Sequence, residues 1–380
     1  MQVSDWARRL ARLAHELEEQ VETAVGQVKR QVRGTRPPRA IVYRGFGTGE
    51  QAQIMGRVLE VEPLREATPE DARWQNLFAT LGRFDSDEVP GARVLVRYGG
   101  ASAEVVADHE GYFRATLPGP GTPDTDPQWR VATTELISPV GLGATGRVLV
   151  PPANARFGVV SDLDDTVLQT GVRRMLHMLS ATFFENVHTR LPFPGVAAFY
   201  HALRVERPGL PPNPIFYVSS SPWNLHDFLL EFLQVRGIPV GPLMLRDWGT
   251  ERDSLLPPGH HEHKSASIER VFSTYPALSF LLIGDSGQQD PEIYRDIVER
   301  HPGRVLAVYI RDVSLNPIRT AAVHQLAAEV AELGSVMVLV EDTVAAARHA
   351  ADHGWIAPER VEAVARDLME TSEGSDGEGA

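Results

Sequence analysis

The sequence has no cysteine, no long apolar run and no excess of positive charge, and each absence excludes a class of protein. Without cysteine the chain can form neither a disulfide nor a catalytic thiolate, which permits a cytoplasmic location. No run reaches the ~18 apolar residues of a transmembrane helix, and the N-terminus lacks the apolar core of a signal peptide. The formal net charge of -13 argues against a nucleic-acid-binding protein.

Changes of composition along the 380 residues predict four segments. Residues 1–36 repeat apolar side chains every three or four positions, as an amphipathic helix does. Residues 39–152 contain short alternating runs separated by Gly, Pro and Asp, a pattern typical of a small β-sandwich. Residues 153–366 alternate near-continuous apolar strands with helical stretches, which favours a parallel sheet covered on both faces. Residues 367–380 are acidic and small, and we expect them to be disordered.

The roles of the first two segments stay open at this stage. The predicted helix has basic ends, at residues 8–12 and 29–33, that favour contact with anionic lipid. Its acidic middle, at residues 16–22, favours packing on the protein itself or on another copy instead. The β-rich segment shows no constellation of catalytic residues, so we interpret it as a scaffold or positioning module, with membrane docking as the alternative.

The strongest chemical signal is an apolar run, residues 157–161, that leads into Asp162, Asp164 and Thr166. An apolar strand that ends in acids predicts a polar pocket at the carboxyl end of a buried strand. Acids two positions apart leave an extended strand on the same face, where their charges repel. A cation between them would relieve that repulsion, so the motif indicates Mg²⁺ chemistry with one Asp free to act as a nucleophile.

Three further elements follow in order along the chain. A second apolar strand, residues 215–218, ends in Ser219 and Ser220. Ser221 and Pro222 then predict a helix N-terminus whose N–H groups would bind an anion. Lys264 comes next, and a third apolar strand, residues 280–284, ends in a segment that holds Asp285 and Asp290.

These four elements together resemble the haloacid dehalogenase superfamily of phosphohydrolases, over roughly residues 155–345. The resemblance implies a Rossmann-like α/β catalytic domain with a parallel sheet, preceded here by the β-sandwich-like segment and the N-terminal helix. It implies Asp162 as nucleophile and Asp164 as general acid and base, with Ser219 and Lys264 holding phosphoryl oxygens. Asp162, Asp285 and the backbone carbonyl of Asp164 would bind Mg²⁺, and Asp290 would be a ligand or an outer partner.

The motifs around Asp165, Thr170 and Gly171, with residues 217–223, 263–264, 284–294 and 309–313, are similar to one family in particular. That family is the phosphatidate phosphatase catalytic domain first associated with fungal actin-patch proteins. The resemblance implies Mg²⁺-dependent hydrolysis of phosphatidate to diacylglycerol, with a phospholipid partner met at the membrane surface. Two alternatives remain: a phosphatase of a soluble phosphomonoester or phosphoprotein, and a binding module without activity. The sequence does not define an oligomeric state.

Other side chains near these motifs have two possible interpretations each, one functional and one structural. Arg246 follows an apolar run and is a candidate, with Ser220, for contact with the phosphate or headgroup; an ion pair is the alternative. His260, His261 and His263 suit a transition metal, but their Pro/Gly-rich surroundings favour a solvated loop, with His263 orienting Lys264. Trp223 is expected to pack beneath the Ser219 loop rather than to contact lipid.

Overall fold

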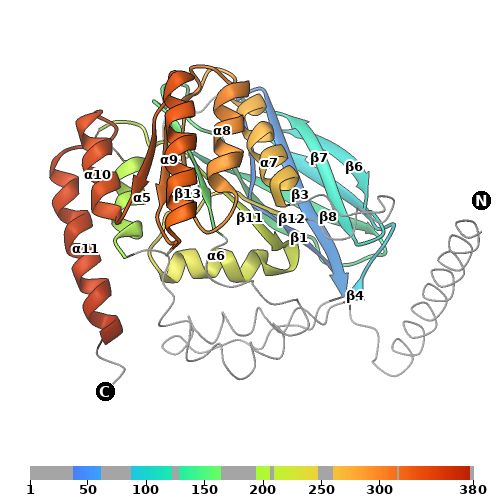
Figure 1. Ribbon diagram of the computed structural model, residues 1–380. Helices are drawn as coiled ribbons and strands as arrows, with labels where there is room; N and C mark the ends of the chain where they lie inside the picture. Colours follow the sequence, from blue (N-terminus) through green and yellow to red (C-terminus); the bar gives the residue numbers. More distant parts are fainter. Residues whose placement is uncertain are drawn as a thin grey trace, which may run out of the picture.

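The computed structural model describes residues 37–60, 87–121, 128–163, 194–205, 209–246, 260–314 and 316–376. The helix predicted over residues 1–36 and the acid at Asp164 lie outside these residues. The described part is an α/β protein built on two sheets, one of mixed pairing and one parallel (Figure 1). No helix in this part combines the length and the apolar character needed to cross a bilayer.

The β-rich segment forms one nine-stranded sheet. The alternation of apolar and polar residues along a strand predicts which side chains face the core. In the strand of residues 93–98, Val94, Val96 and Tyr98 are buried on one side, while Arg93 and Arg97 are exposed on the other. Instead of two separate sheets, the strands join into one hydrogen-bonded sheet around a shared core. Its strands are β1 (Pro38–Val42), β2 (Gly45–Gly47), β3 (Gln51–Glu60), β4 (Asp87–Glu88), β5 (Arg93–Tyr98), β6 (Ala101–Val106), β7 (Tyr112–Pro118), β8 (Trp129–Ser138) and β9 (Thr145–Leu149).

The second sheet has six strands, all parallel, in the order β12-β11-β10-β13-β14-β15. These strands are β10 (Gly158–Asp162), β11 (Ile215–Pro222), β12 (Leu243–Arg246), β13 (Phe280–Asp285), β14 (Val305–Arg311) and β15 (Met337–Val340). Successive strands β10, β11 and β12 are therefore added toward one edge of the sheet. Strand β13 then returns to the other side of β10, and β14 and β15 are added toward the opposite edge. In open parallel sheets the crevice at such a reversal, outside the carboxyl ends of the strands, is where ligands bind.

Helices cover both faces of the parallel sheet, as its buried strands require. On one face the core includes side chains of α5 (Val196–Arg204), α6 (His226–Val235), α10 (Thr343–Asp352) and α11 (Glu359–Asp376). On the other face it includes side chains of α7 (His260–Thr274), α8 (Asp290–Arg300) and α9 (Pro317–Glu332). Because α7 and α8 begin next to the carboxyl ends of β11 and β13, residues of their first turns lie near the crevice.

Helix α11 corrects one expectation from the sequence. It continues to Asp376, so most of the segment predicted as disordered, residues 367–380, is helical. Val364 is fully buried and Leu368 packs against the same core, so the apolar stripe of α11 extends past the point where the composition becomes acidic. Residues 377–380 lie outside the described residues.

The nine-stranded sheet packs directly on the strand that carries Ser219. The ring of Tyr43 stacks on Trp223 at 4.6 Å between centroids and lies 4.5 Å from the His226 ring. Phe46 contacts Phe216 edge-on at 5.7 Å. Trp223 is only 8% exposed, which agrees with the expectation that it packs beneath the Ser219 loop. The two sheets therefore share a buried aromatic interface.

We expect Tyr43→Ala to lower the free energy of unfolding by about 3 kcal/mol, because deletion of a buried aromatic ring leaves a cavity between the sheets. Denaturant unfolding would measure this loss. Val131→Ala is the control, since Val131 is 59% exposed on the same sheet and should change stability by no more than about 0.5 kcal/mol. Similar losses in the two variants would show that the aromatic contact does not hold the sheets together.

Candidate active site

Strand β10 delivers Asp162 to the carboxyl edge of the parallel sheet, beside the crevice. Val159 and Val160 are fully buried on opposite faces, which anchors the strand, and the Asp162 side chain is only 4% exposed. Asp162 pairs in register with Val218 of β11, so Ser219 follows at the same edge on the adjacent strand. Ser219 is fully buried.

Lys264 enters the site from the first turns of α7. Its ammonium Nζ lies 2.7 Å from Oδ1 of Asp162 and 2.8 Å from Oδ1 of Asp290. It also donates to Oε1 of Gln288 at 3.2 Å. With only 2% of the residue exposed, Lys264 is a buried cation that forms ion pairs with two carboxylates and a hydrogen bond with one side-chain amide. Neighbouring His263 lies with Nε2 3.2 Å from the carbonyl oxygen of Ser219, so the same turn contacts both motifs.

Asp285, at the end of β13, sits in a loop that binds its carboxylate. Its Oδ1 accepts from the backbone N–H groups of Gly287, at 2.6 Å, and Gln288, at 3.1 Å. The backbone N–H of Asp285 donates to Oδ2 of Asp290 at 3.2 Å. Gly284 is required for this arrangement, because a Cβ there would lie 2.5 Å from that same Oδ2. The two acids are therefore fixed relative to each other by the backbone.

The site carries more negative than positive charge. One oxygen each from Asp162, Asp285 and Asp290 lie within 4.8 Å of one another, and Lys264 supplies the ammonium between two of them. Burial raises the pKa of Asp290 to about 6, with Lys264 opposing the rise and Asp285 adding to it. When all are ionised, three carboxylates and one ammonium leave an excess of two negative charges. Hard oxygen donors with that excess fit a divalent cation such as Mg²⁺.

The structure brings together most, but not all, of the residues that the sequence singled out. Asp162, Lys264, Asp285 and Asp290 form one cluster, and Ser219 lies beside it. Ser220 is buried next to Ser219. Arg246 ends β12, paired with Pro222, and so lies at the same edge but on the outermost strand. Asp164 lies outside the described residues, and its role stays a prediction.

Two local predictions around the site were wrong. No helix begins at Ser221: β11 runs through Pro222, and a 3₁₀ turn, η2 (Trp223–Leu225), separates it from α6. The reason is that Pro222 pairs with Arg246 and the Ser221 N–H donates to Oγ of Ser219, 3.0 Å away. The three histidines of residues 260–263 do not lie in a loop, because α7 begins at His260.

Sequence reasoning missed an arginine that holds the acidic loop. Arg319, near the start of α9, donates from Nε to the carbonyl oxygen of Ser286 at 2.8 Å and from Nη2 to that of Gln288. Glu292 of α8 accepts from the same guanidinium. The two hydrogen bonds from Arg319 to the loop join residues that are 33 and 31 positions apart, so no local sequence pattern predicts them. Arg319 fixes the backbone on which Asp285 and Gln288 are carried.

The fold and site define an α/β protein with a buried carboxylate–lysine cluster at the reversal point of a parallel sheet. Residues 157–312 match the family model described as phosphatidate phosphatase APP1, catalytic domain. The matched residues run from the start of β10 past the end of β14, and so include the whole described cluster.

Two curated proteins align with the same part of the chain. Phosphatidate phosphatase APP1 of Saccharomyces cerevisiae is 30% identical over 158 residues, which are 41% of this chain and 26% of that protein. An uncharacterized protein of Schizosaccharomyces pombe is 26% identical over 158 residues, 41% of this chain and 25% of its own. The chain thus spans about a quarter of the length of these relatives. A solved carbohydrate acetylesterase from Xanthomonas citri aligns over 75% of this chain and 72% of its own at 14% identity, with a TM-score of 0.25, too low to inform the fold.

Proposed function

We propose that the protein is a Mg²⁺-dependent phosphatase that hydrolyses phosphatidate to diacylglycerol and phosphate. The observation that carries the proposal is the buried Lys264 ammonium, held 2.7 Å from Asp162 and 2.8 Å from Asp290 beside Asp285. A nucleophilic carboxylate, a cation and further carboxylates for a metal are the groups that phosphoryl transfer requires. The match of residues 157–312 to the phosphatidate phosphatase catalytic domain supports the lipid substrate.

In this proposal Asp162 attacks the phosphorus atom through one carboxylate oxygen. A bond from that oxygen to phosphorus forms as the bond to the alcohol oxygen breaks, which gives an aspartyl phosphate and an alkoxide. The resemblance assigns protonation of the alkoxide to Asp164, which would then take a proton from the water that releases phosphate. Lys264 and Ser219 would hold the phosphoryl oxygens as charge develops on them.

Asp162 and Asp285, with the backbone carbonyl of Asp164, would hold the Mg²⁺, which neutralises charge on the phosphoryl group when bound. Asp290 suits an outer role better than direct ligation, because its Oδ1 pairs with Lys264 and its Oδ2 accepts from the backbone of Asp285. It therefore orients both the lysine and the proposed ligand. Such supporting partners commonly change metal affinity or activity 10- to 100-fold when mutated, on the order of 1–3 kcal/mol.

The fold supports a haloacid dehalogenase-type assignment within this proposal. Counted within the parallel sheet alone, the strand order is 3-2-1-4-5-6, with the proposed nucleophile on the first strand and Asp285 on the fourth. A lipid substrate implies that the protein works at a membrane surface, where it would act as a peripheral protein in the cytoplasm.

We expect phosphate release to stop in EDTA and to return on addition of Mg²⁺, because carboxylate oxygens are the ligands this ion prefers. The measurement is phosphate released from phosphatidate in detergent micelles, compared with soluble p-nitrophenyl phosphate. Faster turnover of phosphatidate supports the lipid substrate, and turnover of the soluble ester alone would favour a soluble phosphomonoester or phosphoprotein. Recovery with zinc alone would contradict the metal assignment, and no turnover of any ester with Mg²⁺ present would leave only a binding role.

A further inference from the structure

Two arginines are neighbours on the nine-stranded sheet, at the margin of its interface with the parallel sheet. Strands β2 and β9 are parallel, and Gly45 lies opposite Val148. Arg44 and Arg147 stand one position earlier in each segment, close enough for their charges to interact. Phe46, two positions after Arg44, already packs in the core shared with the parallel sheet. The two guanidinium groups therefore lie where the packed part of this face ends.

Arg44 is held in place by an aromatic ring, but its hydrogen-bond donors are not used. Its guanidinium carbon lies 4.9 Å from the centre of the Trp129 ring, which covers the flat face of the group. Such stacking leaves the N–H groups at the rim of the guanidinium free to donate. In the part of the chain that the structure describes, Nε of Arg44 is buried and has no hydrogen-bond partner. Arg147, beside it, is exposed.

The pair carries two positive charges that no carboxylate balances. Neither arginine forms an ion pair with a residue that the structure describes, whereas Arg97 on the same sheet pairs with Glu135 at 2.8 Å. Burial, and then repulsion by Arg147, lowers the pKa of Arg44 to about 10, so Arg44 is still charged at neutral pH. Two like charges held together in a partly desolvated position are unfavourable unless an anion lies between them.

A phosphate group matches this arrangement in charge and in donor geometry. Guanidinium groups bind phosphate oxygens through pairs of N–H groups, and two of them balance the charge of about −1.5 to −2 on a phosphate monoester. Val131, opposite Arg147 on β8, is 59% exposed and gives the site an apolar border. The phosphate therefore belongs either to a free ion or ester, or to a lipid headgroup whose apolar part rests on Val131.

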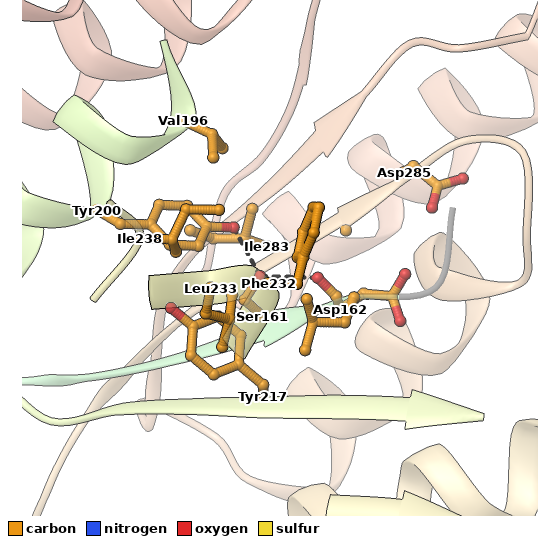
Figure 2. A pocket seen from close by; sticks show the side chains of 12 residues that line it. Ser161, Asp162, Val196, Tyr200, Tyr217, Phe232, Leu233, Ile238, Ile283 and Asp285 are labelled. Carbon is orange, nitrogen blue, oxygen red and sulfur yellow. Dashed lines mark hydrogen bonds between the residues drawn. The ribbon is translucent and has the colours of Figure 1, made fainter. Parts of the chain in front are cut away.

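The arginine pair is separate from the catalytic cluster and from the cavity beside it. Figure 2 shows that cavity, with Asp162 and Asp285 among the residues that line it. The described residues of its wall all belong to the parallel sheet, to the helices on it or to the loops between them, and none comes from β2, β8 or β9. A phosphate held by Arg44 and Arg147 is therefore not the phosphate that the proposed reaction would cleave.

We propose that Arg44 and Arg147 form a second, non-catalytic binding site, for a phosphate dianion, at the margin between the two sheets. The site gives the β-rich segment a binding role in addition to its role as a scaffold. It uses none of the residues of the proposed reaction, so it is tested independently of the phosphatase activity. A phosphate bound there neutralises the pair and stabilises the folded protein, because the unfolded chain does not hold the two arginines together.

The first experiment measures the unfolding temperature of the full chain in EDTA, at fixed ionic strength, as chloride is replaced by inorganic phosphate or glycerol 3-phosphate. EDTA is present because, without a metal, the three carboxylates of the catalytic cluster repel phosphate. Phosphate also stabilises proteins non-specifically, so the readout is the difference between variants. We expect Arg147→Gln to weaken the apparent phosphate affinity at least about tenfold, through loss of a charge-assisted contact. An equal rise in the wild type and in Arg147→Gln would overturn the proposal.

Arg97→Gln is the matched control, because it makes the same chemical change on the same sheet at an arginine that already pairs with Glu135. It should leave the response to phosphate unchanged. In chloride alone, at low ionic strength, Arg147→Gln should raise the unfolding temperature, since it removes the repulsion on Arg44. A lower unfolding temperature in chloride, together with an unchanged response to phosphate, would show that Arg147 has only a structural role.

A second experiment identifies the source of the phosphate. Calorimetric titration with inorganic phosphate and with glycerol 3-phosphate is compared with sedimentation of the protein on phosphatidylcholine vesicles with and without phosphatidate, all in EDTA. Binding of the soluble ions that is lost in Arg147→Gln and kept in Arg97→Gln assigns the site to a free phosphate or ester. The same difference seen only on vesicles that contain phosphatidate assigns it to a lipid headgroup. If no arm depends on Arg147, the site is refuted.

Discussion

Asp162→Asn is expected to reduce kcat for phosphatidate by about 10⁴-fold or more while the protein stays folded. An amide nitrogen and a neutral amide oxygen cannot attack phosphorus as the carboxylate does. In other hydrolases, removal of the nucleophile lowers kcat by a factor of this order or more. The substitution keeps the shape of the side chain, and Lys264 keeps its contact with Asp290 at 2.8 Å. The measurement is phosphate release under saturating substrate, together with the unfolding temperature in EDTA.

Asp352→Asn is the matched control for Asp162→Asn, since it makes the same chemical change at an exposed position near the end of α10. It should leave kcat unchanged. Substantial turnover by a well-folded Asp162→Asn protein would show that another group is the nucleophile. A loss of activity accompanied by unfolding would instead mean that the Asp162–Lys264 pair is needed for the fold.

Two acids of the cluster were predictable from the sequence because they stand at the ends of apolar runs. Asp162 and Asp285 each follow a near-continuous apolar strand, and the carboxyl ends of parallel strands meet at one edge of a sheet. Lys264 is less obvious by position, since it lies on α7 rather than on a strand. The chain nevertheless contains only two lysines, at positions 29 and 264, among 37 basic residues. In a sequence that otherwise uses arginine, the presence of a lysine therefore itself indicates a candidate functional residue.

What the sequence could not predict depends on contacts between distant segments. The extension of β11 through Pro222 follows from pairing with Arg246, 24 residues later, which no helix-capping pattern can anticipate. Arg319 holds the acidic loop from a separate helix. In each case local propensity was ambiguous and tertiary packing decided.

Lys264→Arg is expected to lose most activity although it preserves the positive charge. The ammonium of Lys264 contacts three side chains, those of Asp162, Gln288 and Asp290, whereas a guanidinium presents its donors in one plane and needs more room. The site offers little room, since Lys264 is 2% exposed. We expect kcat to fall by at least about 10²-fold, as for loss of one aligned donor to a developing oxyanion. Lys29→Arg is the control at the other lysine, assayed with p-nitrophenyl phosphate.

Lys264→Met separates the charge of the lysine from its shape. This variant leaves the carboxylates of Asp162 and Asp290 without their shared cation, and loss of one member of a buried ion pair typically destabilises by 3–5 kcal/mol, so we expect a loss of about that size in EDTA. Because Asp290 is fully buried, the additional change Asp290→Asn should recover part of that stability but none of the activity. Denaturant unfolding and phosphate release measured on the two variants would test this. Recovery of turnover in the double variant would mean that Lys264 serves only to neutralise Asp290, and that the phosphoryl oxygens are held by another group.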